Sequence, residues 1–401
     1  MKLSIFFISI GIGIISYMTY NINKYMENPL ELRELNSINK NCHHINIQTT
    51  MNYLIPFKEN YLIASEYKPF DLYEFHSYLN NKIYNDILYL IDVKTEKYSV
   101  ITINDFPSDV PFHPHGLSLF KKSENEYILY VINHAVDYNY KGRERIEKIN
   151  IIYNPKDKDI KMYYDSSISL PEEYFLRVDS IAVINEDVFY FTTNAPFPSP
   201  TDSEELSDLK AKILFYASRV IKLSMTMLNI KQCKVYLYNN KNTFNKISVI
   251  SESESLLNKG IAFDKKRNLL YVMSSMEKEL NIFKIKNKDD YDTKLIKKIP
   301  ILYVGNNIYY DDEKDLIYIG INGKMNEFDS LVYSYKKNKN FENLGIFSGY
   351  EIISPKNDYS INELTLFKNE FKWVSSSIQV NDKNYMSSIF TKGINVCSDI
   401  K

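Results

Sequence analysis

Residues 260–272 read GIAFDKKRNLLYV, and residues 307–320 read NIYYDDEKDLIYIG. Each stretch consists of a strand-like run, a charged turn and a second strand-like run with Leu or Ile followed by Tyr. The two turns begin at Asp264 and Asp311, which are 47 positions apart (311 − 264). A repeat of about 40–50 residues, with about four short strands in each unit, is typical of a β-propeller blade. The sequence therefore predicts an all-β fold of the propeller type.

Other parts of the chain show the same strand-and-turn pattern. Residues 86–92 (DILYLID) and 97–103 (KYSVITI) flank a short turn and predict a β-hairpin. The region that follows the N-terminus, divided by blades of about 40–50 residues, gives roughly six to seven blades. Residues 25–401 are accordingly expected to form one propeller domain.

The composition excludes one class of partner. The chain has 401 residues, of which 44% are hydrophobic and 25% are charged, and its formal net charge is −1. Such a chain can bury a large core, but it lacks the positive charge with which proteins neutralise phosphates. We therefore expect no binding of nucleic acid.

The N-terminus is strongly apolar. Residues 3–20 contain no charged side chain, and Lys2 and Lys24 flank them. A run of about 18 apolar residues is at the short end for crossing a bilayer. No pair of small residues marks a cleavage site after it, so residues 1–24 are interpreted as an uncleaved signal anchor, with a removed signal peptide as the alternative.

A Pro-rich loop at residues 196–202 precedes a different pattern. In residues 206–221 the apolar side chains recur at helical spacing, and Asp202 or Ser203 can cap the start. This pattern predicts an insertion helix that packs on one face of the propeller. A lid over a pocket or a contact with a membrane is the alternative role.

Two histidines are the strongest candidates for chemistry. His115 lies in the sequence FHPHGLS (residues 112–118), and His134 ends the sequence VINH (residues 131–134). Two short strands about a turn would separate them, so both rings can reach one pocket. Because the imidazole pKa lies near 6.5, one ring can activate water while the other relays the proton. The alternative is that each is an ordinary core or surface histidine.

The residues around these histidines resemble the paraoxonase/arylesterase family, whose histidine dyad has this context. Three further segments agree in order with family motifs: residues 178–183 (VDSIAV), 259–261 (KGI) and 306–320. The resemblance covers nearly everything from Asn41 to the C-terminus. It implies a six-bladed propeller and the activity of an arylesterase or lactonase, with His115 and His134 as the catalytic pair.

The family resemblance also implies a disulfide between the ends of the domain. The chain has three cysteines, Cys42, Cys233 and Cys397, and the resemblance pairs Cys42 with Cys397. Cys233 is expected to be a buried thiol rather than a nucleophile. Disulfides form in oxidising compartments. The expected location is the secretory pathway, either membrane-anchored in the endoplasmic reticulum or at the cell surface, or else extracellular.

Calcium is the cofactor that the resemblance implies, but the family's calcium ligands are only partly present. In the family, the catalytic calcium at the floor of the central tunnel takes a Glu, two Asn and an Asp-Asn pair. The corresponding positions here contain no carboxylate, and Lys259 stands at one of them. An ammonium there would repel a cation; it can instead pair with Asp179 or hold an anionic ligand. Asp179 matches one ligand of the family's second, structural calcium, whose acidic partner near the first cysteine is missing. The remaining candidate metal ligands are Asn52, Asn258, Asn306, Asn307 and Leu117.

Two functions follow from this comparison. The first is a membrane-anchored propeller with weak or no ester or lactone hydrolysis, which binds or helps to assemble a partner such as a membrane protein or a hydrophobic small molecule. The alternative is an active arylesterase or lactonase with His115 as general base. Stabilisation of the oxyanion is commonly the largest catalytic contribution, and calcium would supply it here. The lost carboxylates therefore favour the first function, and whether the chain is an enzyme stays open.

Overall fold

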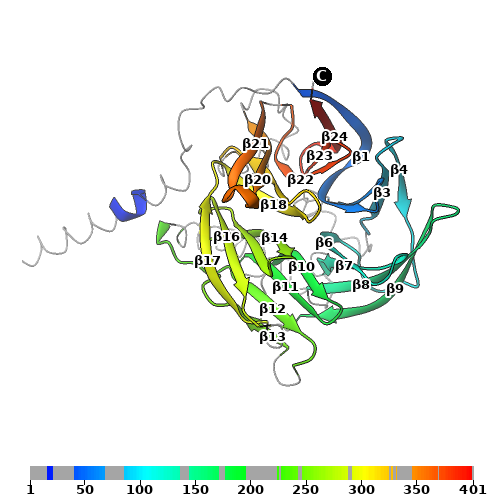
Figure 1. Cartoon of the computed structure of the whole chain (residues 1–401), viewed down its shortest axis with the longest axis horizontal. Coiled ribbons are helices and arrows are strands. Elements are labelled where there is room, and N and C mark those ends of the chain that lie inside the picture. Colours follow the sequence, from blue (N-terminus) through cyan, green and yellow to red (C-terminus); the bar gives the residue numbers. More distant parts are fainter. Residues whose placement is uncertain are drawn as a thin grey trace, which may run out of the picture.

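The computed structural model describes residues 16–20, 40–67, 85–135, 144–170, 177–195, 224, 227–242, 246–287, 291–324, 327, 331, 346–368 and 370–399. β-Sheets make up nearly all of this part of the chain, and they are arranged around a common centre (Figure 1). All strand pairs in this part are antiparallel except β5 (Ile103–Asn104) with β9 (Asp159–Ser169), which are parallel. The predicted all-β propeller is confirmed.

Four sheets of four or five strands follow one another along the chain. The first has five strands, paired in the order β5-β9-β8-β7-β6, and each of the other three pairs its strands in sequence order. Their strands are β5 (Ile103–Asn104), β6 (Pro114–Lys121), β7 (Glu126–Asn133), β8 (Arg145–Asn154) and β9 (Asp159–Ser169); β10 (Arg177–Asn185), β11 (Val188–Ala195), β12 (Val235–Asn239) and β13 (Ile247–Val249); β14 (Asn258–Asp264), β15 (Leu269–Ser274), β16 (Glu279–Ile285) and β17 (Thr293–Pro300); β18 (Val304–Asp311), β19 (Leu316–Asn322), β20 (Phe347–Ser354) and β21 (Ser360–Lys368). A 3-10 turn, η4 (Pro355–Asn357), joins β20 to β21.

The fifth sheet has seven strands and contains both ends of the domain. Its order is β22 (Val374–Val380), β23 (Lys383–Ser388), β24 (Lys392–Asp399), β1 (Lys40–Phe57), β2 (Tyr61–Glu66), β3 (Leu88–Asp92) and β4 (Lys97–Ile101). The long strand β1 pairs with β24 as far as Thr50 and with β2 from Met51 onward. The prediction of six separate blades is therefore wrong. The described strands form four separate blades and one seven-stranded sheet, because β1 is continuous through two sets of pairing partners.

A disulfide closes the ring at this seven-stranded sheet. Cys42 on β1 is bonded to Cys397 on β24, and the two residues are also direct partners in the strand register. The predicted pairing is confirmed, and it indicates an oxidising environment for the folded chain. Cys233 is fully buried and its Sγ donates a hydrogen bond to the carbonyl oxygen of Leu256.

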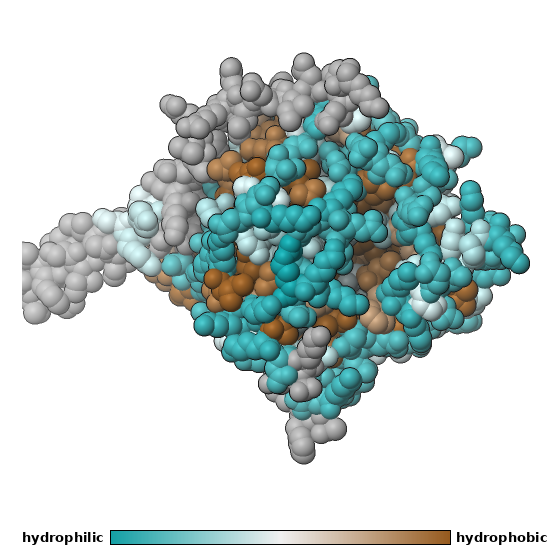
Figure 2. Space-filling view, in the orientation of Figure 1, coloured by the Kyte–Doolittle hydropathy of each residue, from teal (hydrophilic) through white to brown (hydrophobic). Residues whose placement is uncertain are grey.

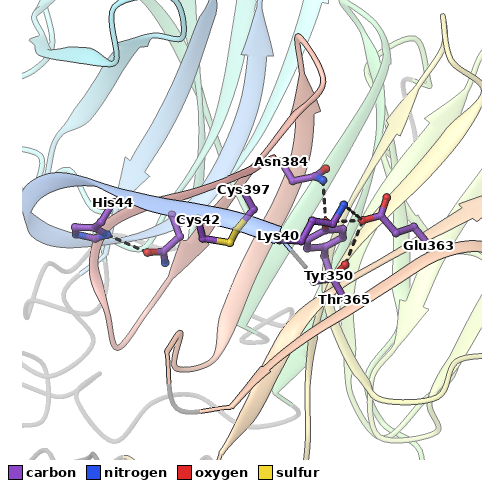
Figure 3. The surroundings of a disulfide bond; sticks show 9 residues. Lys40, Cys42, His44, Tyr350, Glu363, Thr365, Asn384 and Cys397 are labelled. Atoms are coloured by element: carbon purple, nitrogen blue, oxygen red, sulfur yellow. Dashed lines mark hydrogen bonds and ion pairs between the residues drawn. A yellow bond between two sulfur atoms is a disulfide. The ribbon is translucent and has the colours of Figure 1, made fainter. Parts of the chain in front are cut away.

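Polar contacts next to the disulfide join the seven-stranded sheet to its neighbour (Figure 3). The Nζ of Lys40 on β1 lies 2.7 Å from Oε1 of Glu363 on β21, and the Lys40 side chain is only 2% exposed. The Tyr350 hydroxyl donates to the same carboxylate at 2.6 Å, and the Asn384 amide donates to Tyr350 at 2.8 Å. The first and last strands of the propeller, β1 and β24, are thus held to each other and to the adjacent blade.

Apolar cores fill the spaces between successive sheets. One cluster joins β14–β17 to β18–β21 around Tyr271 and Ile319, and another packs the two halves of the seven-stranded sheet against each other around Leu62 and Ile394. Hydrophilic residues cover most of the face seen in Figure 2, with hydrophobic ones in the recesses between them. Burial of these interfaces supplies the main driving force for closing the ring.

The two predicted helices lie mostly or wholly outside the described residues. Residues 16–20 of the predicted anchor form a short helix, and the remaining residues of positions 1–24 lie outside the described residues. In the part of the chain that the structure describes, no helix combines the length and apolar character needed to cross a membrane. The predicted insertion helix at residues 206–221 lies outside the described residues, so both helices stay predictions.

Candidate functional site

The two candidate histidines lie together near the centre of the propeller. His115 is the second residue of β6, and His134 directly follows β7, its antiparallel partner. Their ring centroids are 4.7 Å apart, the ring planes are inclined by 51°, and both residues are at most 5% exposed. The structure thus brings together the pair that the sequence predicts; its catalytic role stays a prediction.

Gly116 determines how closely His115 approaches the next blade. A Cβ on Gly116 would lie 2.6 Å from the carbonyl oxygen of Asp179 on β10, which is closer than real Cβ contacts allow. Only glycine therefore permits this approach of β6 to β10. The approach brings Nδ1 of His115 within 2.9 Å of the same carbonyl oxygen.

This hydrogen bond fixes the tautomer of His115. A carbonyl oxygen can only accept, so Nδ1 carries the proton and Nε2 keeps the lone pair that a general base needs. Burial, reinforced by the neighbouring His134, holds the pKa of His115 well below its usual range. His115 is therefore neutral at physiological pH. The edge of its ring also contacts Tyr67, with 5.3 Å between the ring centroids.

His134 has an acidic partner that the sequence reasoning missed. Its Nδ1 lies 2.8 Å and 3.0 Å from the two carboxyl oxygens of Glu144, a buried residue. Burial raises the pKa of Glu144 to about 8. The β7–β8 register gives the reason for the contact: Asn133 faces Arg145, so positions 134 and 144 continue the same antiparallel pairing. A hairpin prediction extended by one residue could have found it.

A second buried histidine–carboxylate pair lies close by in the chain. Nδ1 of His113 is 2.9 Å from Oδ2 of Asp86, and both side chains are less than 10% exposed. The backbone amide of His113 donates to Asn133 at 2.8 Å, and the backbone amide of His134 donates to the carbonyl oxygen of His113 at 3.1 Å. These bonds fix the segment that carries His115, and the sequence reasoning did not identify them.

Asp179 is the one carboxylate among the predicted metal ligands, and the ammonium group of Lys259 balances its charge. The Nζ of Lys259 on β14 lies 2.7 Å from Oδ1 of Asp179, and the Asn194 amide donates to the same oxygen at 2.5 Å. Burial alone would raise the pKa of Asp179, but the Lys259 ammonium, His115 and these hydrogen bonds bring it below its usual value. The predicted pairing of Lys259 with Asp179 is present.

The amide residues among the predicted ligands bond to other protein groups. Asn307 on β18 donates to Ser375 at 3.1 Å, and the Ser375 hydroxyl in turn bonds to Oδ1 of Asn52 on β1. The Asn258 amide donates to the carbonyl oxygen of Ser253 at 3.0 Å. Asn52, Asn258, Asn306 and Asn307 are all buried.

Leu117, the last predicted ligand, is an apolar core residue. Its side chain is 2% exposed and lies in the cluster between the seven-stranded sheet and β5–β9.

These residues do not fit a resident calcium ion. Calcium prefers six to eight oxygen ligands, several of them anionic. Oδ1 of Asn258, Oδ1 of Asn307 and Oδ2 of Asp179 are buried without a hydrogen-bond partner, so neutral oxygens are available. The only carboxylate among the candidate ligands, however, contacts an ammonium group, and the described residues contain no cluster of three or more His, Cys, Asp or Glu side chains that could hold a metal.

Comparisons with known proteins place these observations in context. A model of the arylesterase family matches residues 75–340. No curated protein matches the chain.

Three solved structures are similar over most of the chain. A luciferin-regenerating enzyme is 9% identical with a TM-score of 0.47, covering 90% of this chain and 95% of its own. A putative gluconolactonase is 12% identical with a TM-score of 0.48, covering 92% and 97%. A gluconolactonase from Xanthomonas campestris is 11% identical with a TM-score of 0.46, covering 92% and 93%.

Proposed function

The chain belongs to the arylesterase family, and from this premise we propose that it is a calcium-independent member with weak or no ester or lactone hydrolysis, which works as a binding or assembly protein. The observation that carries the proposal is the 2.7 Å contact between Nζ of Lys259 and Oδ1 of Asp179. Calcium would have to displace this ammonium group from Asp179, the only carboxylate among the candidate metal ligands. Binding of calcium there is unfavourable, because the calcium ion and the Lys259 ammonium group would lie close together and repel each other.

The loss of calcium matters more for turnover than the retained histidines do. In ester hydrolysis, negative charge develops on the carbonyl oxygen, and preorganised positive charge or hydrogen-bond donors must stabilise it. His115 can take a proton from water, but a general base alone typically contributes about 10²–10⁴-fold. A propeller with the base and without the metal is expected to turn over esters slowly.

A binding role agrees with the hydrogen bonds that the buried candidate ligands Asn52 and Asn307 form with protein groups. Ser375 accepts a hydrogen bond from Asn307 and donates one to Asn52, so these side chains satisfy one another. The terminal disulfide indicates the oxidising secretory route. We propose a partner in or at the membrane of that route, held there with this chain by the apolar segment at residues 3–20; a hydrophobic small molecule is the other candidate partner.

The test of this function compares the purified full-length chain with its His115→Gln variant. Hydrolysis of phenyl acetate and of a simple lactone should be slow or absent in both proteins and unchanged between calcium and chelator, and calorimetry should show no micromolar calcium site. Cross-linking in secretory membranes should give the same partner with both proteins. A high-affinity calcium site, or calcium-dependent turnover that His115→Gln abolishes, contradicts the proposal.

A second function is favoured by one specific observation, the fixed tautomer of His115 beside His134. In this alternative the chain hydrolyses carboxylic esters or lactones, with Nε2 of His115 as general base and His134, backed by Glu144, as the relay. The Lys259 ammonium would then stabilise the oxyanion. Calcium-independent turnover that is lost in both His115→Gln and Lys259→Met would favour it.

A further inference from the structure

We infer that the Lys259 ammonium is a built-in substitute for a metal cation: it neutralises Asp179 and so holds β14 to β10 beside His115. The inference deepens the proposed loss of calcium binding. It proposes that the ammonium group of Lys259 takes the place that a calcium ion would have beside Asp179.

The contact between Lys259 and Asp179 resembles a buried ion pair more than a surface salt bridge. The Asp179 side chain is fully buried and that of Lys259 is 23% exposed, so water screens the pair only on one side. The backbone of Lys259 is also fixed, because the Thr192 hydroxyl donates to its carbonyl oxygen at 2.6 Å. A buried carboxylate without a nearby cation is strongly destabilising, and here the Lys259 ammonium is the cation that compensates it.

Lys259 acts on the candidate site through Asp179. The carboxylate of Asp179 bonds to Lys259, and the carbonyl oxygen of the same residue accepts the Nδ1 proton of His115. The ammonium therefore fixes the residue that sets the tautomer of His115. Lys259 is a positioning residue in this arrangement, since no contact joins it directly to the histidine ring.

Three buried oxygens near Lys259 lack a hydrogen-bond partner and are of the kind that a hard cation prefers. The oxygens Oδ2 of Asp179, Oδ1 of Asn258 and Oδ1 of Asn307 are buried and have no partner. They come from the neighbouring inner strands β10, β14 and β18 (Figure 1). A Cβ on Gly260 would lie only 2.8 Å from Cα of Asn307, which shows how closely β14 and β18 approach. An asparagine in place of Lys259 would add another neutral oxygen to this set and give divalent cations a site.

The experiment measures thermal unfolding of the full-length, disulfide-bonded chain with calcium and with chelator. The wild-type midpoint should be the same in both. Lys259→Met should unfold about 5 °C lower or more, with no response to calcium, and Lys259→Arg should recover most of the loss. Lys259→Asn should unfold at a low temperature in chelator and at a clearly higher one in calcium.

Lys286→Met is the matched control. Its ammonium lies 2.8 Å from Asp292, but both side chains are about half exposed. This variant should unfold within about 1 °C of the wild type. Should a Lys259 single variant not fold, the neutral pair Asp179→Asn with Lys259→Met should restore folding without any calcium response.

Three outcomes overturn the inference: calcium stabilises the wild type, Lys259→Met behaves like the Lys286→Met control, or Lys259→Asn is destabilised without responding to any divalent cation. The last outcome would reveal an ordinary ion pair. None of these measurements uses turnover or a partner, so the inference and the proposed function can fail separately. Fast calcium-independent hydrolysis that His115→Gln abolishes would contradict the function alone, and an unaltered Lys259→Met midpoint would contradict the inference alone.

Discussion

The ring of His134 lies 4.7 Å from the ring of His115, and the two residues sit at facing ends of neighbouring strands. Each ring has a different anchor: a backbone carbonyl for His115 and a carboxyl group for His134. The pair is therefore held in one orientation before any ligand arrives.

The first prediction concerns acid sensitivity. The pKa of His115 is lowered in the folded state, so on acidification the unfolded chain takes up this proton first. The stability that the neutral ring contributes is present above the unfolded pKa of about 6.5 and is lost as pH falls through the folded value. Denaturant unfolding from pH 7 to pH 5 should show a smaller loss for His115→Gln than for the wild type. An equal loss in both proteins would contradict this.

Glu144 should be needed to hold His134. Glu144→Leu removes the acceptor of a buried hydrogen bond, and we expect the free energy of unfolding to fall by about 1–3 kcal/mol. The control is Glu124→Leu, because the Glu124 side chain is 78% exposed and contacts only lysines at the surface. Urea denaturation compares the two variants, and similar small effects would argue against a role for Glu144.

Glu351 on β20 should make the protein lose stability as pH rises from about 4.3 to about 8. Its two carboxyl oxygens are buried without a hydrogen-bond partner, and burial raises its pKa to about 8. Because the folded pKa exceeds the unfolded value of about 4.3, stability is full at low pH and is lost as pH rises toward 8, by up to about 1.4 kcal/mol per pH unit. Glu351→Gln should reduce this slope, which urea titrations at several pH values would measure. The exposed Glu313→Gln should leave the slope unchanged.

The disulfide should dominate the resistance of the ring to opening. Cys42 and Cys397 are 355 residues apart in the chain, and the chain-entropy model assigns such a closure up to about 5–6 kcal/mol. Cys42→Ser should therefore lower the unfolding midpoint strongly, and a reductant should do the same to the wild type. Cys233→Ala leaves both ends tied and should change the midpoint far less. A reductant without effect would contradict this prediction.

Gly260 should tolerate no side chain. A Cβ there would lie 2.3 Å from the backbone nitrogen of Ile308, so β14 and β18 would have to separate. Gly260→Ala is expected to cost about 2 kcal/mol or more in unfolding free energy. In Gly323→Ala the nearest atoms to the added carbon belong to the end of the Glu327 side chain, which can move, so this variant should be nearly neutral. Chemical denaturation of both variants provides the comparison.

Local patterns in the sequence predicted the strands, the propeller and the histidine pair. The 260–272 and 307–320 repeats became β14–β15 and β18–β19, because alternating apolar residues and charged turns are properties of a few neighbouring residues. The number of separate blades was predicted incorrectly. Only the pairing of strands that are far apart in sequence shows that β1 pairs with both β24 and β2.

The sequence by itself predicted an all-β propeller with His115 and His134 on adjacent strands, and its family resemblance predicted the bond between Cys42 and Cys397. Only the tertiary structure decided which groups face these histidines. Glu144 reaches His134 across a hairpin, and Lys259 reaches Asp179 from 80 positions away. Such contacts depend on how the blades close around a common centre, and closure is a property of the whole ring rather than of any segment.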